Sequence, residues 1–174
     1  MLKARVKMKM EKQSNGLQDL YVEQLQDLYN AENQLIKALP KMAKAARSEE
    51  LKEAFEEHLE VTRQHANRIE GILAQINEKA GGKKCHAMEG LVVEGDEAVK
   101  KDVPEEVIKD AGLIAAAQRV EHYEMAGYGT VRTFAEMLGY DEAARTLQQT
   151  LDEEEQADKT LTQISESLLA KVNN

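Results

Sequence analysis

Acidic residues interrupt the apolar stripes of this chain at helical spacing, and this pattern is the strongest constraint on its fold. The segment RVEHYEMAGYGT, residues 119–130, has the periodicity of a helix with one buried face, yet Glu121 and Glu124 lie on that face. An isolated charge buried in an apolar interior costs several kcal/mol. The fold must therefore supply partners for these carboxylates.

Four long segments carry apolar residues every three or four positions, which predicts amphipathic helices. They run from about Leu17 to Ala46, from Ser48 or Glu49 to about Lys79, from near Pro104 to Leu138, and from Asp141 to about Val172. We expect Ser48 and Asp141 to be N-caps, Gly81 and Gly82 to end the second helix, and Gly139 to end the third. The absence of Trp and the presence of only 2 Phe and 2 Pro also favour helix.

The lengths of the connections predict the topology. Short turns near residues 47 and 140 join the helices into two antiparallel hairpins. The long connection between the hairpins, residues 80–103, contains HAMEGLVVEGDEAV, which reads as a short amphipathic helix. The expected fold is therefore an all-α, ferritin-like four-helix bundle of two antiparallel hairpins with one long crossover. We assign residues 15–174 to this bundle and the basic segment 1–14 to a disordered tail.

The charge distribution and the apolar runs exclude several classes of protein. A formal net charge of −9 at pH 7 disfavours binding to nucleic acid. No run of about 18 apolar residues exists to span a membrane, and the basic first residues lack the apolar centre of a signal peptide. The chain has 1 cysteine, Cys85, which cannot form an internal disulfide. We expect a cytoplasmic protein with a free thiol, no nucleic-acid partner and no membrane partner.

Every predicted long helix places polar residues on its inward line, at one common depth. In an antiparallel hairpin, residues equidistant from the turn lie side by side. Counting from the turn near residue 140 places the two acids of the third helix beside residues 156–159, and therefore beside Glu154 and Asp158. Counting from the turn near residue 47 places Glu32 beside residue 63, between Thr62 and His65. The four helices therefore converge on one polar layer.

Clustered carboxylates require a cation, and no Lys or Arg lies on the inward lines at this depth. Carboxylates with one or two imidazoles suit two divalent metal ions, iron in first place and manganese as the alternative. The candidate metal ligands are Glu32, Glu121, Glu124, Glu154, Asp158, His65 and His58. Tyr128 and Thr62 are expected beside them, with the Tyr128 hydroxyl bonded to a carboxylate.

Other readings stay open at individual positions. Glu32 could lie at the edge of its stripe and reach solvent, and Asp158 could cap or pair locally. His58 could be a core histidine that bonds to a carboxylate. Glu153 and Glu155 flank the stripe of the last helix, and we expect them to be solvated.

Several segments resemble those of the YciE/YciF family of ferritin-like stress proteins (DUF892). They are AENQL (31–35), HLEVT (58–62), CHAMEGL (85–91), LIAAAQRVEHYEMAGYGT (113–130), LGYDEAA (138–144) and LDEEEQADKTL (151–161). The resemblance covers nearly the whole chain beyond the first dozen residues. It implies a ferritin-like bundle that forms a homodimer.

The polar layer is also similar to the di-iron centre of rubrerythrin. Glu121 and Glu124 match two glutamates of that protein's third helix, and Glu32 matches the glutamate of its first helix. The fourth helix carries two acids where that centre has a glutamate and a histidine four residues apart. The second helix carries Thr62 and His65 where that centre has Glu-x-x-His, so the bridging glutamate is absent.

Two functional hypotheses follow. In the first, a stress-response protein uses a dimetal site for Fe(II) oxidation or peroxide handling, with dioxygen or peroxide as its reactant. In the second, the chain is a non-catalytic structural or interaction dimer with a vestigial or structural metal site. The acid pairs of the third and fourth helices favour the first hypothesis, and the absent glutamate favours the second.

Overall fold

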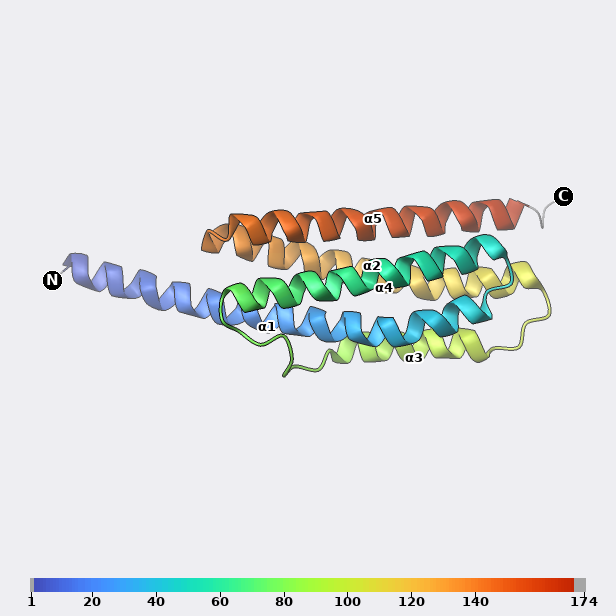
Figure 1. Ribbon diagram of the computed structural model, residues 1–174, viewed down its shortest axis with the longest axis horizontal. Coiled ribbons are helices and arrows are strands. Elements are labelled where there is room, and N and C mark those ends of the chain that lie inside the picture. Colours follow the sequence, from blue (N-terminus) through green and yellow to red (C-terminus); the bar gives the residue numbers. More distant parts are fainter. Residues whose placement is uncertain (1, 171–174) are drawn as a thin grey trace.

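The computed structural model of the chain describes residues 2–170, and it describes side chains from Gly16 onward. The described residues form α1 (Leu2–Ala45), α2 (Glu49–Gln75), α3 (His86–Lys100), α4 (Glu106–Leu138) and α5 (Asp141–Ala170) (Figure 1). No strand occurs within residues 2–170. The expected all-α fold is confirmed.

The helices are arranged as two antiparallel hairpins with α3 in the crossover between them. α1 packs most extensively against α2, and α4 against α5, while contacts of α1 with α4 and of α2 with α5 close the bundle. α3 packs against α1 and α4, on the side of the bundle away from α5 (Figure 1). The predicted topology of four long helices and one short crossover helix is therefore confirmed.

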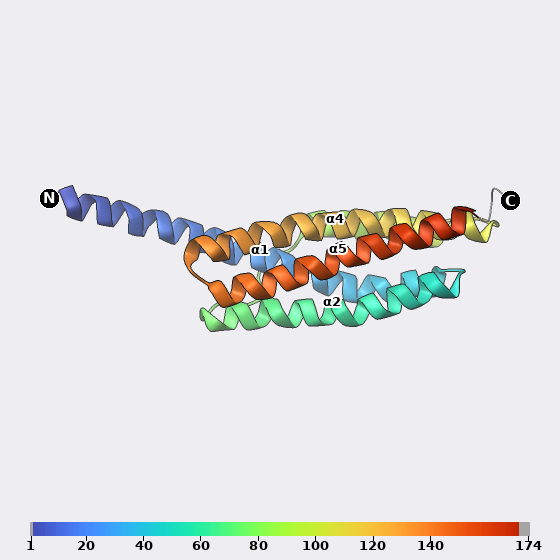
Figure 2. The same cartoon turned by 90° about the horizontal axis from the view of Figure 1, so that it is seen from above.

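The first helix differs from its expected start. Its backbone is helical from Leu2 rather than from near Leu17, because the segment contains good helix formers such as Lys and Met and no proline. In both views this part of α1 extends beyond the ends of the neighbouring helices (Figures 1 and 2). The buried core begins only at Tyr21. The division into a tail, residues 1–14, and a bundle, residues 15–174, stays a prediction.

The second helix ends earlier than the glycine pair indicates. Its last residue is Gln75 rather than Lys79, and Asn77 takes the left-handed conformation with φ 58°. The N–H of Glu78 then bonds to the carbonyl of Leu73 at 2.9 Å, which closes the helix end. Asparagine tolerates this conformation better than most residues, so no glycine is needed here.

The helix caps agree in part with expectation. Ser48 is the N-cap of α2, and its Oγ accepts a backbone N–H at 3.4 Å. Gly139 ends α4 with φ 77°, as expected. Asp141 is the first residue of α5 rather than its N-cap, because the N–H of Ala144 bonds to the carbonyl of Tyr140 at 2.9 Å. The expected end of this helix near Val172 lies outside the described residues.

Two buried charges at the start of α4 hold the crossover and the first turn. The carboxylate of Asp110 accepts the backbone N–H groups of Arg47 and Ser48 at 2.8 and 2.7 Å. The ammonium of Lys109 donates to three backbone carbonyls at the end of α3, each at 2.8 Å. Both charges are thus satisfied by backbone groups that helix ends leave without partners.

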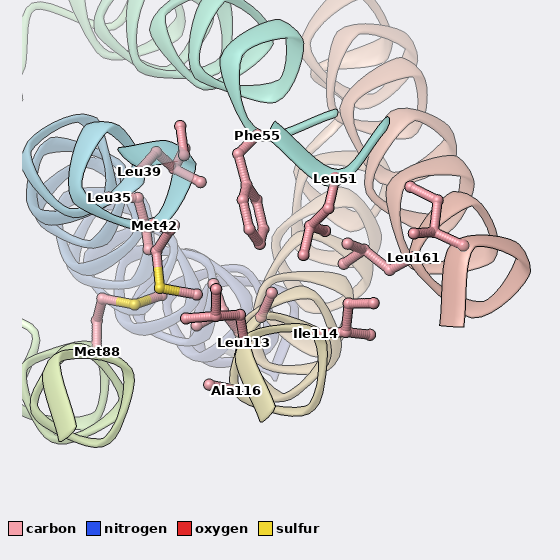
Figure 3. Packing of buried hydrophobic residues seen from close by; sticks show 14 of the residues in the cluster. Leu35, Leu39, Met42, Leu51, Phe55, Met88, Leu113, Ile114, Ala116 and Leu161 are labelled. Atoms are coloured by element: carbon pink, nitrogen blue, oxygen red, sulfur yellow. The ribbon is translucent and has the colours of Figure 1, made fainter. Parts of the chain in front are cut away.

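The apolar core is divided into two clusters along the bundle axis. The first lies toward the α1–α2 turn and includes Leu39, Leu51, Phe55, Leu113 and Leu161 (Figure 3). The second lies toward the α4–α5 turn and includes Tyr21, Leu25, Leu73, Val131 and Leu147. The predicted polar residues lie between the clusters. Among residues 2–170, none of the helices combines the length and the apolar character that a membrane span requires.

Candidate metal centre

The polar side chains that interrupt the apolar stripes meet in one layer at the middle of the bundle. Each of the long helices contributes: Glu32 from α1, His58 and His65 from α2, Glu121 and Glu124 from α4, and Glu154 from α5. The four carboxylates and His65 are buried, and His58 is largely buried. The alternative that Glu32 reaches solvent is wrong, because its side chain is fully buried.

The nitrogen and oxygen atoms of the layer form two groups that could each hold a metal ion. Within each group, one atom per residue lies within 4.8 Å of the others. The first group consists of His58, Glu121, Glu124 and Glu154, and the second of Glu32, His65 and Glu154. Glu154 belongs to both groups, so its carboxylate lies between two candidate metal positions.

Most polar atoms of the layer lack a hydrogen-bond partner, although they are buried. They are Glu32 Oε2, His58 Nε2, His65 Nδ1, Glu121 Oε2 and both carboxylate oxygens of Glu124 and of Glu154. His65 Nδ1 lies 3.0 Å from Glu154 Oε1, and His58 Nε2 lies 3.6 Å from Glu121 Oε1. Buried polar atoms without partners are rare in folded proteins. These atoms are also the donor types that iron and manganese accept, so the residues fit such ions.

A second layer of contacts orients His65. Its Nε2 lies 2.8 Å from Glu153 Oε2, and Arg68 donates to both Glu153 oxygens at 2.5 and 3.0 Å. An ionised carboxylate can only accept, so Nε2 carries the proton and, in the neutral ring, Nδ1 turns its lone pair toward the layer. This is the arrangement by which carboxylates orient metal-binding histidines.

Glu153 corrects an expectation from the sequence. It is not simply solvated, because it lies between His65 and Arg68 with its side chain only 31% exposed. Partial burial would raise the pKa of Glu153, but hydrogen bonds from Arg68, Gln149 and His65 outweigh it and lower that pKa to about 2. Glu153 is therefore ionised at neutral pH, and Arg68 balances its charge.

The pKa values of the carboxylates in the layer are shifted in the opposite direction. Burial raises the pKa of Glu32, Glu121 and Glu154 to about 8. Burial, followed by repulsion from Glu32 and the other acids, raises the pKa of Glu124 well above its usual range. At neutral pH and without cations, the layer therefore keeps protons that exposed glutamates would release.

Tyr128 and Thr62 lie at the layer, as expected. The Tyr128 hydroxyl donates to Glu32 Oε1, and it is fully buried. α4 approaches α1 so closely here that a Cβ added at Gly127 would lie 2.7 Å from a terminal methyl of Leu28. Thr62 is buried between the two histidines of α2, and its hydroxyl donates to the carbonyl of His58 at 2.8 Å.

Asp158 is the one predicted ligand that the structure does not bring into either group of ligand atoms. Its Oδ1 accepts from Gln118 Nε2 at 3.0 Å and lies 3.5 Å from His122 Nε2. Asp158 is one helical turn beyond Glu154, where the interior is filled by the first apolar cluster. Its carboxylate therefore lies at the partly exposed edge between α4 and α5, and its contacts with Gln118 and His122 are made across to α4 rather than locally.

Cys85 is a free, buried thiol, as expected. It is the N-cap of α3, and its Sγ lies 2.9 Å from the hydroxyl of Tyr123. The Tyr123 hydroxyl donates to Asp27 at 2.7 Å. Neither Cys85 nor Tyr123 is part of the two ligand groups.

The chain is similar to proteins of one family over most of its length. A family model described as a domain of unknown function, DUF892, matches residues 16–173. Protein YciF of Escherichia coli (strain K12) is 46% identical over 150 residues, which are 86% of this chain and 90% of YciF. The crystal structure of YciF, described as a stress protein, matches with a TM-score of 0.85 and 44% identity over 89% of this chain and 98% of that chain.

Two further solved structures share the fold. YcfI from Rhodopseudomonas palustris matches with a TM-score of 0.79 and 39% identity, over 84% of this chain and 92% of that chain. A dodecameric thioferritin from Bacteroides fragilis, related to bacterioferritin, matches with a TM-score of 0.68 over 94% of this chain and 96% of that chain. Its identity is 17%, so it bears on the fold alone, which is ferritin-like as expected.

The raised pKa values predict an unusual pH dependence of the metal-free protein. The folded state of Glu32, Glu121 and Glu154 has a pKa of about 8, against an ordinary value of 4.5. Between these values the folded chain binds more protons than the unfolded chain, so stability falls as pH rises. In the presence of a chelator, we expect Tm to fall by several degrees between about pH 6 and about pH 9.

The matched variant is the double substitution Glu121→Gln and Glu154→Gln, which keeps the shape of the layer and removes two titrating groups. Its Tm should change much less over the same pH range. A wild-type Tm that is constant or rises across this range would contradict the assigned electrostatics.

Proposed function

The chain belongs to the DUF892 family, and from that premise we propose that it is a ferritin-like stress-response protein whose bundle core binds two divalent metal ions. Iron is the first candidate and manganese the alternative. The observation that carries the proposal is the set of buried nitrogen and oxygen atoms without hydrogen-bond partners, which converge from the four long helices. A pair of cations would satisfy these atoms and neutralise the carboxylates together.

Each group of ligand atoms would hold one ion. His58, Glu121 and Glu124 would bind the first, Glu32 and His65 would bind the second, and Glu154, which belongs to both groups, could contribute to either. Bound iron supplies one-electron chemistry, in which Fe(II) is oxidised while dioxygen or peroxide is reduced. Asp158 is not among the ligands in this proposal.

The chain's own residues would prepare the site for this chemistry. Glu153 and Arg68 hold the His65 ring so that Nδ1 faces the second group. The Tyr128 hydroxyl donates to Glu32 Oε1, whereas Glu32 Oε2 has no partner. The carboxyl groups that keep protons at neutral pH would release them when cations bind, because metal ligands must be deprotonated. The apolar clusters on both sides limit access of water to the layer.

The cellular setting is proposed from the same premise. YciF is described as a stress protein, and this chain is similar to it over most of both lengths. We place this chain in the cytoplasm as a homodimer that meets dioxygen or peroxide during stress.

The number of metal ions bound per chain tests the proposal, and variants distinguish the two metal positions. Anaerobic titration with Fe(II) or Mn(II), followed by metal analysis, should find about two ions per wild-type chain. Glu154→Gln removes the shared carboxylate and should abolish both sites, whereas Glu32→Gln should retain about one ion. Glu155→Gln, a partly exposed neighbour, is the control and should bind like wild type. Wild-type protein that takes up no metal would overturn the proposal.

Glu153 provides a separate test, because it does not itself belong to either ligand group. Glu153→Ala should weaken metal binding about 10- to 100-fold, since His65 loses the partner that orients its ring. Glu153→Ala alone also leaves the positive charge of Arg68 without its partner. The double variant Arg68→Met and Glu153→Ala removes that charge, and its metal affinity should remain low. Isothermal titration measures the affinities, with Glu155→Ala as the control. Equal affinities in all these proteins would exclude an orienting role for Glu153.

Thr62 favours a second candidate, a non-catalytic structural or interaction dimer with a structural or vestigial metal site. Thr62 stands where the second helix of the rubrerythrin centre carries a bridging glutamate. Its hydroxyl donates to a carbonyl of its own helix. A structural site would lower the Tm when a chelator removes the metal, while Fe(II)-loaded protein would consume no oxygen. Oxygen consumption that stops in Glu154→Gln would favour the oxidative function.

A further inference from the structure

A small apolar cavity lies between α1, α3 and α4 and ends at the candidate metal centre. Its volume is about 40 Å³, and its walls include Leu35, Met42, Val92, Ala117 and Val120. In Figure 3, Met42 of α1 and Met88 of α3 point toward one another, with Ala116 of α4 nearby. Leu91, Val92, Gly95 and Asp96 of α3 line the cavity, so the crossover helix forms one of its walls.

Three polar residues interrupt the apolar lining of the cavity. His58 and Glu121, which belong to the first ligand group, line the cavity. His58 Nε2 and Glu121 Oε2 have no hydrogen-bond partner. Asp96 of α3 also lines it and pairs with Lys41 of α1 at 3.1 Å, with side chains 28% and 54% exposed. The lining of the cavity thus includes residues of the first ligand group and one member of a partly exposed ion pair.

A second cavity reaches the same two residues from the opposite pair of helices. It lies between α2 and α5 and has a volume of about 240 Å³; its walls are largely apolar, with Phe55, Val61 and Leu161 among them, but Glu57, Glu153 and Gln156 line it besides His58 and Glu121. Acidic and amide groups suit a hydrated cation or a polar reactant. Beyond the two shared residues, the first cavity offers only Asp96, so a charged or strongly hydrated species would lose its solvation along most of its walls.

The volume of the first cavity also limits its occupant. One water molecule requires roughly 10–15 Å³ of such volume together with several polar partners, which in this lining only His58, Asp96 and Glu121 could provide. A diatomic gas fits the same space and needs no hydrogen bonds. The chemistry of the walls therefore selects a small, uncharged, apolar molecule.

We propose that this cavity binds dioxygen and delivers it to the His58–Glu121 side of the metal centre. The inference rests on the proposed function, since it names the reactant of that site and its route. The binding step involves no bond formation and needs only the apolar walls, so it can be measured without metal.

Dissolved dioxygen is paramagnetic and speeds the nuclear relaxation of the methyl groups that it contacts. In metal-free, methyl-labelled full-length chain under oxygen pressure, the enhancement should be concentrated on Leu35, Leu91, Val92 and Val120. Gly95→Leu should abolish this concentration, because a Cβ at Gly95 lies 3.8 Å from Met42 Sδ and the remaining carbons would enter the cavity. Gly90→Leu is the matched control, since Gly90 is exposed on the same helix.

A second pair of variants keeps the test valid if Gly95→Leu fails to fold. Val92→Phe fills the cavity from α3, and Val93→Phe changes the adjacent residue, which is 53% exposed and outside the lining. Loss of the enhancement in Val92→Phe but not in Val93→Phe supports the proposal. Enhancement spread over the surface, or unchanged in both cavity-filling variants, overturns it.

Metal titration of the same proteins separates this inference from the proposed function. Gly95→Leu should bind metal like wild type, and in Fe(II)-loaded protein it should raise the KM for dioxygen severalfold while Gly90→Leu leaves it unchanged. Chains that take up no metal but keep the localised, Gly95-sensitive enhancement would support the gas cavity and overturn the metal function. Equal KM values in the cavity-filling variants and wild type would overturn delivery by this route.

Discussion

Repulsion and desolvation among buried carboxylates are the constraint on which the rest of the structure depends. Glu32, Glu121, Glu124 and Glu154 lie in one layer, where burial raises their pKa values. The layer is neutral either because it holds protons or because it holds cations. Apolar clusters on both sides supply the packing that keeps the helices together, so the bundle can tolerate this layer.

The two ligand groups are built differently, and this asymmetry gives them different tasks in our proposal. The side that contains Glu32 and His65 is enclosed by Tyr128 and by the Glu153–Arg68 pair. The side that contains His58 and Glu121 adjoins two cavities, of which the one between α2 and α5 carries more acidic and amide side chains than the other. An ion on the Glu32–His65 side would be held in a fixed geometry, while an ion on the His58–Glu121 side would be open to exchange and to a small reactant.

Sequence reasoning recovered what helical periodicity and hairpin counting can determine. The order of the helices and the depth of Glu121 and Glu154 follow from the short α4–α5 turn, because equidistant residues lie together. Contacts between separate hairpins have no such rule, so the pairing of Arg68 on α2 with Glu153 on α5 was missed. A signal existed, since Arg68 lies one turn beyond His65. Asp158 was placed too far inward, because a helical stripe does not show where the surrounding core is already filled.

The most direct test of the central claim is a crystal structure of the protein soaked anaerobically with Mn(II), with anomalous difference maps. We predict two peaks inside the bundle, one among His58, Glu121 and Glu124 and one between Glu32 and His65, with Glu154 contacting both. Soaked crystals without a peak in the buried layer, or with peaks only on surface acids, would contradict the account.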